Sequence, residues 1–278
     1  MSESSNSLAA LRRTIAALDR KAPEQVADRF ATGHPGLDAA LGGGLARGRL
    51  HELFADGQEA GAGTGMALLL AQLAAGEDCG ERGGRPLLWL RGEGSARMDG
   101  APYGPGLAAI GIAPERLLLG VLTDTASLLQ AALDGLRCPA LGAVIVEVRG
   151  RQPLIDLTAT RRLVLAAEGS GVTALMARIG GDPVPSAAET RWQVAAAPSA
   201  PLPGDAPGHS AFDLTLLRRR AGPDGLHWRV EWQARRGSFG DYDRGSEHDG
   251  RETGGDGAAL SGAVVPVPAA RPAADRAA

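Results

Sequence analysis

Thr32-Gly33-His34-Pro35-Gly36-Leu37-Asp38 begins the most informative stretch of the chain, which continues to Leu73. Within it, a predicted strand (Leu50–Phe54) is followed by a glycine-rich segment (55–65) and an apolar, helix-like run that starts at Met66. A strand, a glycine loop and a helix in this order form a phosphate cradle, because backbone amides and the helix N-terminus face the bound phosphates. We therefore predict a phosphate loop whose contributing residues are Gly57, Gly61, Gly63, Thr64 and Gly65.

This predicted cradle lacks the lysine that normally reaches the outer phosphates of a nucleotide. The only lysine of the chain is Lys21, which lies upstream, and Asp56 and Glu59 bring negative charge to the loop. Losing the lysine removes a hydrogen bond to a charged group, worth roughly 1.5–3 kcal/mol. The sequence thus predicts weak ATP or ADP binding at most and no significant ATP hydrolysis.

The composition narrows the class of protein. A chain of 278 residues is long enough for one sizeable α/β core with extensions, and a formal charge of −3 gives no global attraction to nucleic acid or to an anionic membrane. Cys79 and Cys138 are far apart and lack neighbouring ligands, which favours a reducing compartment and argues against a metal site. Residues 1–20 lack a signal-peptide core, and no run approaches membrane-spanning length. We predict a cytoplasmic protein without a membrane partner.

Apolar strands alternate with helical segments from Phe30 to about Arg178, which predicts a mostly parallel sheet covered on both faces. The predicted strands are Leu50–Phe54, Pro86–Leu90, Leu117–Leu119, Ala143–Val148 and Val172–Ala177. The predicted helices are Met66–Gly76, Gly104–Ile110, Thr125–Leu136 and Thr158–Glu168.

The pattern changes to turn-separated, alternating strands after Arg178, which predicts antiparallel pairing over Arg191–Ala195, Phe212–Arg218 and His227–Ala234. Trp228 and Trp232 share one face and are predicted to be core residues. Three regions follow: residues 1–29 with an amphipathic helix over 7–19, a domain over 30–236, and a glycine-rich, acidic tail over 237–278 that is predicted to be disordered.

The block from Thr32 to Arg49 resembles the signature that precedes the phosphate loop of RecA recombinases, so the fold expected for residues 30 to 235 is a RecA-like P-loop NTPase core. In this resemblance, Glu93 stands at the place of the catalytic glutamate and Glu147 at that of the magnesium-linked acid. Two roles are open for both residues: they support residual hydrolysis, or they are relics of a lost activity. We favour the second.

The chain departs from the recombinases at several positions. Thr64 takes the place of the lysine, Gly65 that of the magnesium-binding hydroxyl, and Arg178 that of the glutamine that senses the terminal phosphate. The two segments that correspond to the DNA-gripping loops are short, which argues against filament-type DNA binding. This combination is similar to the ImuA family, the RecA-related accessory proteins of the bacterial translesion-synthesis mutagenesis cassette.

The resemblance implies a role in damage-induced (SOS) mutagenesis and DNA repair, as a non-catalytic adaptor. The partners that it implies are an ImuB-type inactive relative of Y-family polymerases and an error-prone replicative-type DNA polymerase, with RecA as a further candidate. Two alternatives remain open: a DNA-stimulated ATPase or recombination mediator, and a cell-division inhibitor of the SulA type.

Arginines near the end of the domain form a candidate contact surface. They are Arg218, Arg219, Arg220, Arg235 and Arg236. Such a cluster is typical of a solvated face, and the alternative is contact with DNA or an acidic partner.

Overall fold

A computed structural model describes residues 28–76, 84–199, 201–202, 206 and 208–241. The amphipathic helix predicted over 7–19 lies outside the described residues, as does the predicted tail from residue 242 onward.

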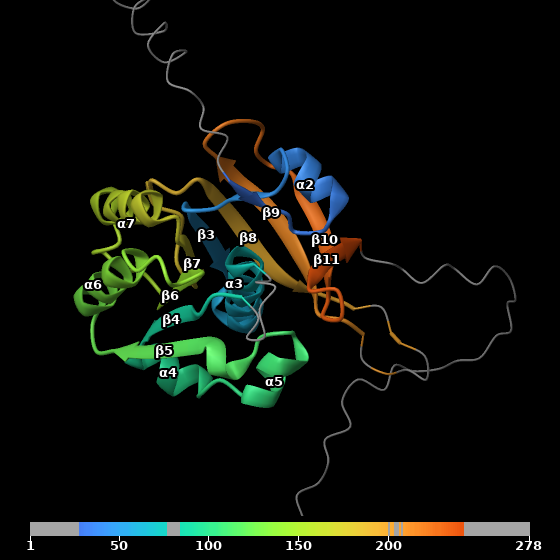
Figure 1. Ribbon diagram of the computed structural model, residues 1–278, viewed down its shortest axis with the longest axis horizontal. Coiled ribbons are helices and arrows are strands. Elements are labelled where there is room, and N and C mark those ends of the chain that lie inside the picture. Colours follow the sequence, from blue (N-terminus) through green and yellow to red (C-terminus); the bar gives the residue numbers. More distant parts are fainter. Residues whose placement is uncertain (1–27, 77–83, 200, 203–205, 207, 242–278) are drawn as a thin grey trace, which may run out of the picture. The chain divides into compact units, whose positions relative to one another are not determined.

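The centre of the described fold is a nine-stranded sheet with the order β11-β10-β9-β8-β3-β7-β6-β4-β5 (Figure 1). The six strands from β8 to β5 pair in parallel, whereas β8, β9, β10 and β11 pair antiparallel. A further small sheet joins β1 to β2. The strand bounds are β1 Arg29–Phe30, β2 Leu45–Ala46, β3 Leu50–Ala55, β4 Leu87–Gly92, β5 Leu117–Leu122, β6 Ala143–Arg149, β7 Thr173–Ile179, β8 Thr190–Ala197, β9 Ala211–Arg219, β10 His227–Gln233 and β11 Ser238–Asp241.

Helices cover both faces of the sheet. On one face α3 packs with the apolar residues of α2 and α5 in one core cluster, and on the other face α6 and α7 form a second cluster. The helix bounds are α2 Pro35–Leu41, α3 Ala60–Ala75, α4 Glu93–Asp99, α5 Gly104–Ala109, α6 Thr125–Leu136 and α7 Leu157–Ser170, with short 3-10 turns η1 Gly57–Glu59 and η2 Pro114–Arg116. The α/β, mostly parallel architecture predicted from the sequence is confirmed, and so are the antiparallel C-terminal strands. Trp232 is buried and Trp228 packs against the same cluster, as predicted.

The prediction of a loop over residues 55–65 is wrong, because most of these residues are helical. β3 ends at Ala55 and α3 begins at Ala60, so only residues 56–59 connect them. Gly63 explains why the helix starts early: a Cβ at this position would lie 2.7 Å from Ala55 Cβ and 2.8 Å from Ile179 Cδ1. Its bare backbone therefore lets α3 pack closely on the sheet, and the burial gained offsets the low helix propensity of glycine.

The opening signature has a structural role at the start of α2. His34 caps the helix, with Nδ1 accepting from Leu37 N at 3.1 Å. Asp38 accepts hydrogen bonds from Thr32 N, Thr32 Oγ1 and Gly33 N, at 2.8, 2.8 and 3.0 Å. Gly44 has φ of 110°, and a Cβ there would overlap the Phe30 carbonyl. These contacts fix the backbone that leads into α2.

The boundary predicted at residue 236 is also wrong, because residues 238–241 form β11. Phe239 N donates to Thr32 O at 2.8 Å, and the Phe239 ring lies 4.9 Å from that of Trp232. The buried Phe239 side chain makes this short, glycine-flanked strand part of the core. Composition alone indicated a tail from residue 237, but this single aromatic residue keeps the chain in the sheet.

None of the helices in the described part of the chain combines the length and the apolar character that a membrane-spanning helix needs.

Candidate functional site

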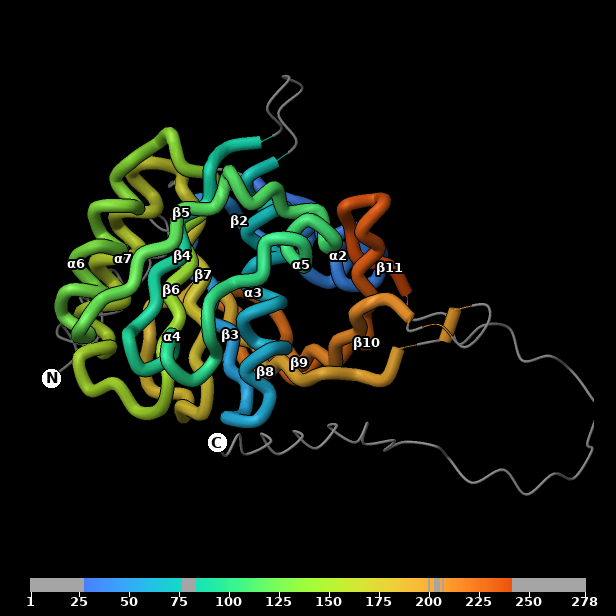
Figure 2. Tube along the Cα trace, turned by 90° about the horizontal axis from the view of Figure 1, so that it is seen from below, coloured from blue at the N-terminus to red at the C-terminus, as the bar shows by residue number. Residues whose placement is uncertain are grey.

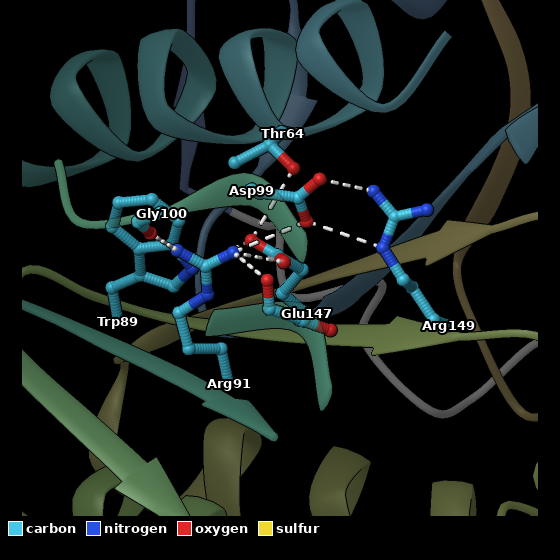
Figure 3. A network of polar contacts seen from close by, with 8 residues as sticks. Thr64, Trp89, Arg91, Asp99, Gly100, Glu147 and Arg149 are labelled. Atoms are coloured by element: carbon cyan, nitrogen blue, oxygen red, sulfur yellow. Dashed lines mark hydrogen bonds and ion pairs between the residues drawn. The ribbon is translucent and has the colours of Figure 1, made fainter. Parts of the chain in front are cut away.

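The candidate site forms where β4 and β6 lie side by side. Their register pairs Leu87 with Ala143, which places Arg91 opposite Glu147. The two side chains meet inside the fold, with 3.1 Å between Arg91 Nη2 and Glu147 Oε1 (Figure 3). Arg91 is 3% exposed and Glu147 is 1% exposed, so this ion pair is shielded from solvent.

Arg91 is held by the segment that follows β4. Its Nη1 donates to Gly100 O at 2.9 Å and its Nη2 to Ser95 O at 3.0 Å. Nη2 also lies 3.2 Å from Asp99, whose carboxylate pairs with Arg149 as well. The guanidinium therefore lies between two acids, and the four side chains Arg91, Arg149, Asp99 and Glu147 carry no net formal charge.

Glu147 has two more partners. Its Oε2 accepts from Trp89 Nε1 at 3.1 Å and from Thr64 Oγ1 on α3 at 3.3 Å. The guanidinium of Arg91 also lies 5.0 Å from the centroid of the Trp89 ring. Burial raises the pKa of Glu147, while the charge of Arg91 acts in the opposite direction. The carboxylate is thus surrounded by donors from three different residues.

A cavity of about 440 Å³ adjoins this network. It is bounded by the start of α3, by β4 and by the segment that follows α4. Its lining includes Gly61, Thr64 and Gly65 of the predicted cradle, together with Trp89, Arg91, Asp99, Tyr103 and Glu147.

The residues present do not fit a magnesium–nucleotide complex. Magnesium needs near-octahedral oxygen ligands at about 2.1 Å, and it usually keeps several waters. Glu147 instead accepts from a buried guanidinium, an indole and a hydroxyl, and a metal ion would have to displace Arg91. Of the predicted cradle residues, Gly61, Gly63, Thr64 and Gly65 lie in α3, and Gly57 lies in η1. Most of their amides therefore belong to a helix and do not form a loop around a phosphate.

Glu93, the other predicted acid, is the first residue of α4 and lines a separate cleft. It pairs with Arg97 on the surface of the same helix at 2.8 Å. Glu147 lines that cleft too, but Glu93 is not part of the Arg91 network.

Arg178 belongs to a second buried ion cluster. Glu52 on β3 lies 3.4 Å from Arg178 Nη1 and 2.9 Å from Arg191 Nε, and it is 0% exposed. Both guanidinium groups also lie over the Phe54 ring. Arg178 therefore ties β7 to β3 and β8, and does not point toward the Glu147 site.

The predicted arginine cluster is separated by the sheet. Arg218 and Arg219 end β9 and Arg220 follows it, whereas Arg235 and Arg236 follow β10. Because β9 and β10 are antiparallel and Ala211 pairs with Glu231, the second pair lies near the start of β9. At about 3.3 Å per residue, the two groups are roughly 25 Å apart. Arg219 also donates to Ala40 O at 2.6 Å, so the five arginines do not form one patch.

Sequence reasoning missed Arg91, Asp99, Glu52 and Arg191. A signal was present for the first of these: Arg91 is the one charged residue of an apolar strand, and Glu147 follows four apolar residues in its own strand. Both are the fifth residue of their strands, so an in-register parallel pairing of β4 with β6 would have placed them together. No comparable signal marked Asp99, which comes from the short helix α4.

No group of three or more His, Cys, Asp or Glu side chains suited to a metal ion occurs within the ranges that the structure describes.

The parallel sheet, the helix after its central strand and an acid near the C-terminal end of β6 define a RecA-like fold, and the Arg91–Glu147 ion pair lies between two of its parallel strands. A solved structure supports this class: the crystal structure of the RadB recombinase matches with a TM-score of 0.51 and 18% identity, over 76% of this chain and 99% of RadB.

The particular family follows from sequence comparison. Protein ImuA of Caulobacter vibrioides, in two strains, is 33% identical over 205 residues, which cover 69% of this chain and 79% of the relative. The chain belongs to the ImuA family. No protein-family profile matches it.

Proposed function

We propose that this protein is a non-catalytic adaptor in SOS-induced, error-prone translesion DNA synthesis. Its membership of the ImuA family supports the biological setting. The observation that carries the non-catalytic part is the buried Arg91–Glu147 pair, which puts a guanidinium where a nucleotide-binding relative would need a metal ion.

The charges around the β6 acid and before α3 support the absence of catalysis. Phosphoryl transfer depends on cations and donors that stabilise the charge on the transferring group. Here the acid of β6 is already neutralised by Arg91, the segment between β3 and α3 spans only residues 56–59, and that segment carries Asp56 and Glu59. Each feature opposes triphosphate binding, and together they leave the domain as a scaffold.

The proposed partners are an ImuB-type relative of Y-family polymerases and an error-prone replicative-type polymerase, which the adaptor would bridge, with RecA as a further candidate. We place this assembly in the cytoplasm. The split of the arginines into two separate groups is a reason not to propose a single DNA-binding face built from them.

One experiment tests the adaptor role directly. The tagged protein is pulled down from cells treated with a DNA crosslinker, and mutation frequency is compared in cells with and without the gene. Recovery of both polymerase-type proteins and loss of induced mutagenesis in the deletion are expected. Recovery of neither, or filamentation of overexpressing cells with unchanged mutation frequency, would point to a division inhibitor and reject the proposal.

A second experiment tests the non-catalytic part. ATP hydrolysis is measured with magnesium, with and without single-stranded DNA, for the unaltered protein and for Thr64→Lys/Gly65→Ser. We expect background turnover from both, because restoring the side chains does not convert the first turns of α3 into a loop. DNA-stimulated turnover by the unaltered protein, abolished in Glu93→Gln, would establish an active ATPase instead.

A further inference from the structure

A groove between α6 and α7 lies on the face of the sheet opposite α3. Both views of the chain place these two helices next to each other (Figures 1 and 2). The groove has a volume of about 660 Å³, and its lining is Leu133, Arg137, Pro139, Arg162, Leu165, Ala166, Gly169 and Ser170. It shares no lining residue with the Glu147 cavity.

Sequence spacing builds this groove. Arg162, Leu165, Ala166 and Gly169 recur at steps of three and four residues, so they form one stripe along α7. Leu133 and Arg137 form the matching stripe at the end of α6. Gly169 opens the floor, because a Cβ added there would meet nothing within 4 Å.

The groove combines apolar contact area with positive charge. Leu165 is 58% exposed, so its apolar surface is open to a ligand in the groove. Among the described residues, none with an acidic side chain lines the groove, and Arg162 has no ion-pair partner. Arg137 makes one exposed pair with Asp134 at 3.6 Å, and exposed pairs of this kind are weak.

We propose that the α6–α7 groove is a docking site for an acidic peptide segment of a partner protein, with apolar residues seated against Leu165 and Ala166 and carboxylates facing Arg137 and Arg162. The apolar floor favours a peptide over nucleic acid. Among the described residues, none with an aromatic side chain lines the groove to stack on bases, and two arginines neutralise few phosphates. The inference deepens the proposed adaptor function and rests on it for the class of partner.

The probe is a fluorescein-labelled synthetic peptide with a Leu-Phe pair flanked by Asp and Glu residues, and binding to the full chain is followed by anisotropy. Arg162→Glu and Leu165→Asp are each expected to weaken binding at least about tenfold. Arg161→Glu is the matched control: it makes the same charge change on the neighbouring residue, which does not line the groove, and it should change the affinity less than about twofold. A peptide with Lys in place of the acids, or Gly-Ser in place of Leu-Phe, should not bind.

Gly169→Leu is a second variant that fills the groove from a position with free space, so the fold should be retained. It is expected to block the peptide while leaving the circular dichroism spectrum and the melting temperature unchanged. Equal losses in Arg161→Glu and Arg162→Glu, or full affinity in Leu165→Asp and Gly169→Leu, would overturn the proposal. So would a single-stranded oligonucleotide whose binding is lost in Arg162→Glu but not in Leu165→Asp.

Induced mutagenesis measured in cells distinguishes a failure of the groove proposal from a failure of the adaptor proposal. If Gly169→Leu abolishes peptide binding and also lowers induced mutagenesis, both the groove proposal and the adaptor proposal are supported. If deletion of the whole gene leaves mutagenesis unchanged, the adaptor role fails even where the peptide binds. If the deletion abolishes mutagenesis and the unaltered protein does not bind the peptide, the groove proposal alone is rejected.

Discussion

Arg91 and Glu147 each make the burial of the other tolerable. A buried ion pair costs desolvation on both sides, which its mutual attraction and additional hydrogen bonds have to repay. Here Trp89, Thr64, Ser95 and Gly100 supply those additional hydrogen bonds. The pair is therefore costly to break at one side only.

Replacing Arg91 with Ala should lower the free energy of unfolding by about 3–5 kcal/mol, because Glu147 is left buried without its charge partner. Urea unfolding followed by tryptophan fluorescence measures the change. The control is Arg97→Ala, which breaks the exposed pair with Glu93 and should cost less than about 1 kcal/mol. Equal losses in the two variants would show that the buried pair contributes nothing special.

His51 lies at the centre of another buried polar network. Its Nε2 lies 2.9 Å from Ala46 O, which can only accept, and its Nδ1 lies 2.7 Å from Thr190 Oγ1. The neutral ring therefore carries its proton on Nε2 and accepts from the threonine hydroxyl, which in turn accepts from Trp192 Nε1 at 2.7 Å. Burial lowers the pKa of His51 to about 4.

This lowered pKa predicts a loss of stability on acidification. Between pH 6.5 and about 4 the unfolded chain binds the proton and the folded chain does not, so the contribution is fully present above pH 6.5 and is lost as pH falls toward 4. A shift of this size corresponds to roughly 3 kcal/mol at most. Urea unfolding from pH 8 to 4 should show the decline, and His51→Gln should flatten it in that window. An unchanged slope in the variant would assign the decline to other groups.

At the scale of elements, α3 decides the character of the site. It begins immediately after a four-residue connection, and its first turns bring Thr64 to Glu147 and Gly63 to the sheet. A RecA-like domain needs a loop at this place to hold phosphates. Here residues 60–65 are already helical, so the strand and the helix of that arrangement are present and the connection between them is reduced to residues 56–59.

Two glycines of α3 provide a matched pair of substitutions. Gly63→Ala should destabilise the fold by about 1–3 kcal/mol, because the new Cβ would press against Ala55 and Ile179 and the helix would have to move. Gly61→Ala places its Cβ in open space and should leave stability unchanged or raise it by up to about 1 kcal/mol. Melting temperatures of the two variants measure the difference. Similar values would mean that α3 does not pack on the sheet as closely as the structure has it.

At the scale of the described domain, the last strand, β11, contacts the residues that precede and cap α2. β11 pairs with β10 at one edge of the sheet, and Phe239 lies between Trp232 and Phe212. His34 at the cap of α2 contacts Asp241 at 2.9 Å, so residues far apart in the sequence hold each other in place.

A chain that ends at Asp241 should therefore fold, and a chain that ends at Arg236 should not. In the full chain, Phe239→Ala should cost about 3–5 kcal/mol, because it empties a site in the core. Circular dichroism and urea unfolding of the three proteins test this. Equal stability of the two truncated chains would show that the domain ends at residue 236 and that β11 is not needed for folding.

Much of the fold could be read from the sequence. Strands with continuous apolar residues indicated the parallel sheet, because such runs are typical of strands that are buried on both faces. The change to alternating residues after Arg178 marked the antiparallel edge. The start of α3 was missed, because glycine indicates a loop from local propensity alone, and the packing that makes Gly63 favourable in a helix lies on distant strands.

Hydrophobic periodicity and residue identity are local properties, so they were enough to predict the class of fold, the missing lysine and the acid near the C-terminal end of β6. The surroundings of that acid, in contrast, depend on which strands become neighbours in the folded sheet. Parallel register brings Arg91 from a neighbouring strand to Glu147, and the α6–α7 groove arises from two helices separated by a strand. Such contacts join residues whose distance along the chain says nothing about their distance in space. They follow from sheet order, which the burial of the whole core selects.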